Sequence, residues 1–170
     1  MKLLTVAWTA AASAATAAAG AVATDPDSRW YQRLRKPDWQ PPAIAFPVVW
    51  TALYADLAVS SAVALDRKDA PDPEGGQDGR REIRAYRSAL AANLVLNATW
   101  SWVFWRARRP WLAAAEAAVL AASSADLVRR TYKLNSSAGV ALAPYALWCG
   151  FATALSTAVA RLNPGAGGRR

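Results

Sequence analysis

Apolar residues along the chain gather into five long stretches that are separated by charged segments. The stretches cover residues 4–23, 46–65, 88–105, 111–128 and 138–160, and their only charged side chains are Asp56, Glu116 and Asp126. A helix needs about 20 largely apolar residues to cross the hydrocarbon core of a bilayer, where no water satisfies the backbone. The pattern therefore predicts an all-α integral membrane bundle of five transmembrane helices, forming a single domain over residues 1–170.

The first stretch has a second interpretation. Met1-Lys2, followed by an apolar run that ends at Ala21-Val22-Ala23, resembles a signal peptide with an A-x-A cleavage site. The apolar run is longer than the usual signal core of about 7–15 residues, which favours a retained helix. Amino-terminal sequencing of the mature protein separates the two, since cleavage would leave a chain that starts at Thr24.

The two connecting segments at the start of the chain differ in kind. Residues 66–87 combine prolines, glycines and mixed charges, which is typical of a solvated connector. Residues 24–45 instead carry Trp30, Tyr31, Leu34 and Trp39 among three prolines. This composition predicts a structured cap packed on the helix ends. Anchoring of the aromatic rings at the level of the lipid headgroups is the alternative.

Composition removes several classes of function. The chain has no histidine, which excludes an imidazole base, a Ser-His triad and a histidine metal site. Its one cysteine, Cys149, excludes an internal disulfide and a CxxC motif. We therefore predict no metal site and no cofactor. The net charge of +8 comes from basic residues divided ten and ten between the two predicted faces of the membrane. That division gives no orientation and no surface for a nucleic acid.

Three sequence blocks carry a family resemblance. The first reads Trp30-Tyr31…Leu34…Lys36-Pro37…Trp39…Pro41-Pro42…Phe46…Val49-Trp50…Leu53-Tyr54, the second Leu96-Asn97-Ala98-Thr99-Trp100…Phe104-Trp105-Arg106-Ala107-Arg108, and the third Leu142-Ala143-Pro144-Tyr145…Trp148…Phe151-Ala152-Thr153…Leu155. In order and spacing they resemble the TspO/translocator-protein family, which includes tryptophan-rich sensory proteins and peripheral-type benzodiazepine receptors. Ala98, Trp105, Arg106 and Ser156 depart from the family pattern. Thr157 stands where a proposed cholesterol motif has tyrosine, so sterol binding is not carried over.

Helical spacing places large rings and a few amides on three faces. They carry Phe46, Trp50 and Tyr54 on the second stretch, Asn93, Asn97, Trp100 and Phe104 on the third, and Tyr145, Trp148 and Ala152 on the fifth. On spacing alone, core packing or lipid contact is the simpler interpretation; the resemblance favours an apolar pocket for a flat ligand. The predicted ligand-binding residues are Trp39, Phe46, Trp50, Tyr54, Asn93, Asn97, Trp100, Phe104, Tyr145, Trp148 and Ala152. Asn97 fits a ligand contact and a tie between helices equally well.

The resemblance implies a membrane protein that binds porphyrins or other tetrapyrroles as a sensor, carrier or regulator of their level. Without histidine, a metal-free porphyrin is the expected ligand, with Arg29, Arg33, Arg35 or Lys36 available for its propionates. One alternative is a light-dependent porphyrin-degrading enzyme, since a photochemical reaction needs no histidine base, only a ring such as Trp39 or Trp148 near the macrocycle. Another is an assembly partner of a second membrane protein. The resemblance also implies a homodimer, and the Arg/Ala-rich composition points to a bacterial cytoplasmic membrane.

Overall fold

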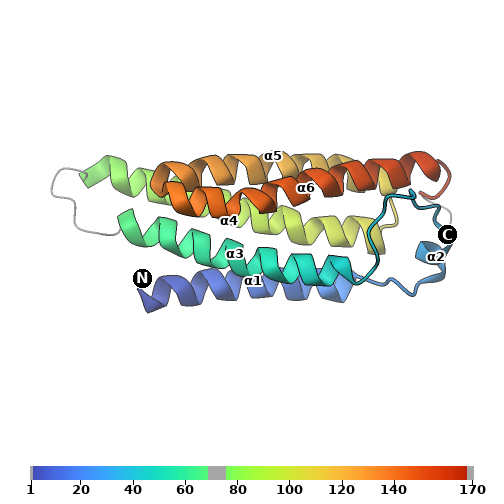
Figure 1. Cartoon of the computed structure of the whole chain (residues 1–170), viewed down its shortest axis with the longest axis horizontal. Coiled ribbons are helices and arrows are strands. Elements are labelled where there is room, and N and C mark those ends of the chain that lie inside the picture. The colour runs from blue at the N-terminus through green and yellow to red at the C-terminus, as the bar shows by residue number, and fades with distance from the viewer. Residues whose placement is uncertain (1, 69–75, 168–170) are drawn as a thin grey trace.

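The protein is a bundle of long helices that lie side by side along one axis (Figure 1). The computed structural model describes residues 2–68 and 76–167, and the regular structure within these ranges is entirely helical. The long helices are α1 (Leu3–Ala23), α3 (Ala45–Lys68), α4 (Gly76–Ser101), α5 (Pro110–Leu134) and α6 (Ser136–Leu162). A short helix, α2 (Arg29–Arg33), lies between α1 and α3, and a π-helical turn, Trp102–Arg106, continues α4. The predicted all-α membrane bundle is confirmed.

Four of the long helices, α1, α3, α5 and α6, are long and apolar enough to cross a membrane. The fifth, α4, begins at Gly76 and carries charged residues through its first turns. Its apolar part is divided between the α-helix and the π-helical turn, and α4 is not among the described helices that are long and apolar enough to cross a membrane.

The start of α4 corrects the expectation of an irregular connector over residues 66–87. Outside residues 69–75, which are not among the described residues, this segment is helical. The reason is tertiary: Tyr86 is buried, and its hydroxyl hydrogen-bonds to Ser61 Oγ on α3 at 3.1 Å and to Thr131 Oγ1 on α5 at 3.0 Å. These contacts hold the base of α4 against two neighbouring helices.

The order of helices around the bundle is α1, α3, α6, α5 and α4, with α4 closing against α1. The α5–α6 interface is the most extensive. A single residue, Asn135, joins these two helices: its backbone N–H donates to Thr131 O at 2.7 Å, and its side chain accepts from Ala138 N at 3.0 Å. A Cβ on Gly139 would lie 2.4 Å from the Tyr132 Cα, so only glycine permits this approach.

The segment between α1 and α3 is a structured cap, as predicted. Asn163 at the end of α6 accepts from the Arg35 N–H at 2.9 Å and donates to the Arg35 carbonyl at 2.8 Å. Trp30 Nε1 donates to Ala166 O at 3.3 Å. Nearby, the Arg106 guanidinium donates to Val22 O at 2.6 Å, placing a cation at the carboxyl end of α1, where the helix dipole favours it.

Candidate ligand-binding site

Aromatic rings from α3 and α6 face each other below the cap. Trp50 on α3 stacks on Tyr54 at 5.5 Å between ring centroids and meets Trp148 of α6 edge to face at 6.5 Å. Tyr145, one turn deeper on α6, also meets Trp50 edge to face, at 6.4 Å. The predicted spacing of rings on both helices thus brings four of the predicted site residues together.

The array continues to the surface of the cap. Trp148 stacks on Phe151 at 5.0 Å, and Trp39 of the cap meets Phe151 edge to face at 5.8 Å. Trp39 is 51% exposed. We call the connected set the ring ladder; from the surface inward it consists of Trp39, Phe151, Trp148, Trp50 and Tyr54. It leads from the exposed rim into the bundle.

Trp100 and Phe104 belong to a second ring group on α4 and its π-helical turn. They stack on each other at 5.3 Å, and Phe104 meets Trp30 of the cap at 5.5 Å. Phe46 and Phe151 pack against the buried cluster that contains Phe104, and both also contact Trp148 of the ring ladder. The two groups are therefore adjacent. The π-helical turn, a feature often found at functional sites, carries Phe104 of the second group.

A chain of hydrogen bonds forms the floor of the ring ladder. The Tyr54 hydroxyl donates to Asn97 Oδ1 at 2.6 Å, and Asn97 Nδ2 donates to the Tyr145 hydroxyl at 3.0 Å. The Tyr145 hydroxyl in turn donates to Asn93 Oδ1 at 2.6 Å. This polar floor ties α3, α4 and α6 together.

The polar floor extends to α5 through Asn93. Its Nδ2 donates to Ser124 Oγ at 3.0 Å and to Ser123 Oγ at 3.2 Å, and Ser124 Oγ lies 3.4 Å from Cys149 Sγ. Both asparagines thus form side-chain hydrogen bonds with residues of other helices in this structure. Asn97 is therefore a tie between helices in this structure, and its contact with a ligand stays a prediction.

Burial divides the predicted site residues into two sets. Asn93, Asn97, Phe104 and Tyr145 are buried within the bundle. The others keep part of their surface accessible, and these are Trp39, Phe46, Trp50, Tyr54, Trp100, Trp148 and Ala152. A ligand would therefore meet mainly ring faces and edges, while the buried residues hold those rings in place.

Two polar groups near the site have no hydrogen-bond partner in the described part of the chain. They are the buried indole nitrogen Nε1 of Trp100 and the buried carboxyl oxygens of Glu116. Asp126 differs, since it pairs with Arg129 at 2.6 Å and Arg130 at 2.5 Å. Trp100 Nε1 is a donor that a ligand acceptor can satisfy. Residues 2–68 and 76–167 contain no group of three or more acids or cysteines that could hold a metal ion.

Phe151, Ser123 and Ser124 were not among the predicted site residues. Phe151 follows Trp148 by three residues on the same face of α6, so its spacing already pointed to the ring ladder. Nothing in the sequence distinguished Ser123 and Ser124, because their partner Asn93 lies on another helix.

Comparison with known proteins agrees with the resemblance. The TspO/MBR family profile matches residues 5–162. A tryptophan-rich sensory protein of Cereibacter sphaeroides is 34% identical over 86% of this chain and 87% of its own length. The translocator protein of Homo sapiens is 29% identical over 84% and 80%, and protein CrtK of Rhodobacter capsulatus is 28% identical over 80% and 79%. This multi-pass membrane protein belongs to the TspO/MBR family.

Proposed function

We propose that the protein binds porphyrins or related flat tetrapyrroles at the ring ladder and acts as a membrane sensor, carrier or regulator of their level. One observation carries the proposal: the ring ladder runs from the exposed Trp39 to Tyr54 inside the bundle. Stacked and edge-to-face rings suit a wide, flat, apolar molecule. The names of the relatives, a sensory protein and a translocator, support a role in sensing or transport.

The cap supplies charges for the acidic groups of such a ligand. Arg33 and Arg35 are exposed on the cap, which also carries Trp39, and the Lys36 ammonium lies 4.2 Å from the centre of the Tyr31 ring. Cations in these positions can pair with the propionates of a porphyrin. Because the chain has no histidine, the proposal specifies a metal-free macrocycle.

Titration with protoporphyrin in the dark tests the proposal. The full chain in detergent is titrated while the visible absorbance of the porphyrin is followed, a readout that does not depend on the number of tryptophans. Trp39→Ala combined with Trp50→Ala is expected to weaken binding at least tenfold. Trp111→Ala is the matched control, since Trp111 lies exposed on α5 and contacts no ring among the described residues. Equal affinity of the double variant and the control would contradict the pocket assignment.

Two further arms separate the alternatives. In the first, the complex with porphyrin is illuminated. A new, protein-dependent product spectrum that Trp148→Phe abolishes would favour the porphyrin-degrading enzyme, because Trp148 lies in the middle of the ring ladder. Absence of porphyrin binding together with stable co-purification of a larger complex would favour an assembly partner.

We also propose a homodimer in a bacterial cytoplasmic membrane, on the strength of the family and of its bacterial members. The face of α1 that carries Ala10, Ala14 and Ala18 is exposed and small enough for close helix approach. Light scattering of the detergent-purified chain measures the protein mass, and a monomer mass at all concentrations would contradict the dimer.

A further inference from the structure

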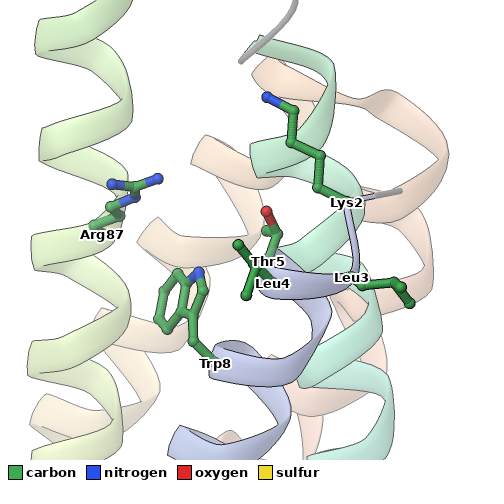
Figure 2. A pocket seen from close by; sticks show the side chains of 6 residues that line it. All are labelled: Lys2, Leu3, Leu4, Thr5, Trp8 and Arg87. Atoms are coloured by element: carbon green, nitrogen blue, oxygen red, sulfur yellow. The ribbon is translucent and has the colours of Figure 1, made fainter.

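A concave surface lies at the end of the bundle opposite the cap, between the first turn of α1 and the middle of α4 (Figure 2). This α1–α4 groove has a volume of about 770 Å³ and is lined by Lys2, Leu3, Leu4, Thr5, Trp8 and Arg87. Figure 2 shows Arg87 reaching from α4 toward α1, with Trp8 reaching from α1 toward α4 just below it. The groove takes no part in the ring ladder.

The apolar side chains that line the groove are exposed. Leu3 and Leu4 are 86% and 84% exposed, and Trp8 keeps over a third of its surface accessible. In a chain that crosses a bilayer, exposed leucines at a helix end contact lipid chains. Tryptophan is enriched at the level of the headgroups. The lower part of the groove therefore lies where an acyl chain meets a headgroup.

The basic side of the groove lies at the same level. Lys2 directly precedes α1, and Arg87 directly precedes the apolar part of α4, so both cations mark the border between charged and apolar sequence. Within the described residues, Arg87 makes no hydrogen bond or ion pair. The Lys2 backbone N–H donates to Asp66 Oδ1 of α3 at 2.8 Å, which fixes the start of α1 beside the groove. Asp66 is not one of the lining residues, but its carboxylate attracts the Lys2 charge, so Arg87 is the principal cation of the groove.

We propose that the α1–α4 groove binds one anionic phospholipid, with the phosphate between Arg87 and Lys2 and an acyl chain along Trp8 and Leu4. Basic pockets between membrane helices attract anionic headgroups, and each Lys or Arg near the surface strengthens the attraction about fivefold. Arginine suits a phosphate because its planar guanidinium donates two parallel hydrogen bonds. A zwitterionic lipid gains less, because it brings its own cation against the same two side chains.

Another basic concave surface, formed by α4 and α5 within the described residues, fits a lipid less well. It is lined by Glu82, Tyr86, Arg129, Arg130, Lys133 and Leu134, with a volume of about 120 Å³. Both arginines already pair with Asp126, and Glu82 adds a negative charge. The anion-binding role therefore belongs to the α1–α4 groove.

Native mass spectrometry of the full chain in detergent tests the proposal. Phosphatidylglycerol and phosphatidylcholine with identical acyl chains are offered at equal concentrations. We expect the wild type to retain phosphatidylglycerol at least fivefold better, and Arg87→Gln to lower that preference about fivefold. Arg81→Gln removes the same charge from an exposed position on α4 outside the groove, and it is expected to leave the preference unchanged.

Three outcomes would overturn the proposal. They are equal retention of the two lipids by the wild type, an unchanged preference in Arg87→Gln, and an equal loss in Arg81→Gln. Displacement of phosphatidylglycerol by millimolar inorganic phosphate would assign the groove to a free anion instead.

Trp8→Ala is expected to weaken retention of both lipids alike, since its contact is with the acyl chain. Arg87 is exposed, so circular dichroism of Arg87→Gln is expected to match the wild type.

Discussion

Tyr145 joins two helices at the bottom of the ring ladder through one hydroxyl. The hydroxyl accepts from Asn97 and donates to Asn93, and the whole side chain is buried. Tyr145→Phe keeps the ring but removes the partner of Asn97 Nδ2 and of Asn93 Oδ1, and a buried polar group left without its partner costs about 1–3 kcal/mol in proteins. Bonds between membrane helices average about 0.6 kcal/mol, so we expect a loss toward the lower end of that range.

The thermal unfolding midpoint of the Tyr145→Phe variant in detergent checks this expectation. Tyr132→Phe is the matched control, because Tyr132 is 55% exposed on α5 and removal of its hydroxyl leaves no buried amide without a partner. Identical midpoints for the two variants would show that the polar floor contributes nothing to stability.

Glu116 is the opposite case, a buried carboxyl whose oxygens lack partners among the described residues. A polar group in that position costs free energy because nothing replaces its contacts with water. We expect Glu116→Met to raise the unfolding midpoint by an amount that corresponds to about 1–3 kcal/mol. Asp126→Asn, which breaks two partly exposed ion pairs, is expected to shift it by less than about 1 kcal/mol in the opposite direction. A lower midpoint for Glu116→Met would point to a partner such as a bound water.

At the scale of elements, the close contact between α5 and α6 depends on Gly139, which has no side chain. A Cβ at position 139 would overlap the Tyr132 backbone, which cannot move without displacing α5. Gly139→Ala is therefore expected to cost about 1–3 kcal/mol, as overpacking of a tight core does. Gly150 lies on the same helix, and a methyl group added there would meet nothing within 4 Å, so Gly150→Ala is neutral or stabilising. The difference between the two unfolding midpoints measures how much the close approach of α5 and α6 contributes to stability. An unchanged midpoint for Gly139→Ala would contradict the expected overlap.

The elements also show which inferences a single sequence allows. Long apolar stretches predicted the membrane helices, and the spacing of Phe46, Trp50 and Tyr54 predicted their shared face, because both are properties of one helix. The partner of Asn97 was not predictable, since the pairing with Tyr145 depends on the register between α4 and α6. For the same reason, the helical start of α4 was missed: Tyr86 holds it through contacts with α3 and α5.

At the scale of the whole molecule, ligand binding and stability are linked. A ligand that binds only the folded protein stabilises it by about 2.7 kcal/mol at a concentration one hundred times its dissociation constant. Protoporphyrin in the dark is therefore expected to raise the unfolding midpoint of the wild type. Trp39→Ala with Trp50→Ala is expected to lose most of that rise, while Trp111→Ala keeps it. An equal rise in all three proteins would place the bound porphyrin away from the ring ladder.

The single residue between α5 and α6 has a consequence for how the protein is made. Asn135 ends one helix and begins the next, so the two helices form a hairpin without a loop between them. With one residue between them, the two helices are confined to adjacent, antiparallel positions and cannot separate within the bilayer. We infer that they assemble as a hairpin, whose outer faces offer a ready surface for α3 and α4.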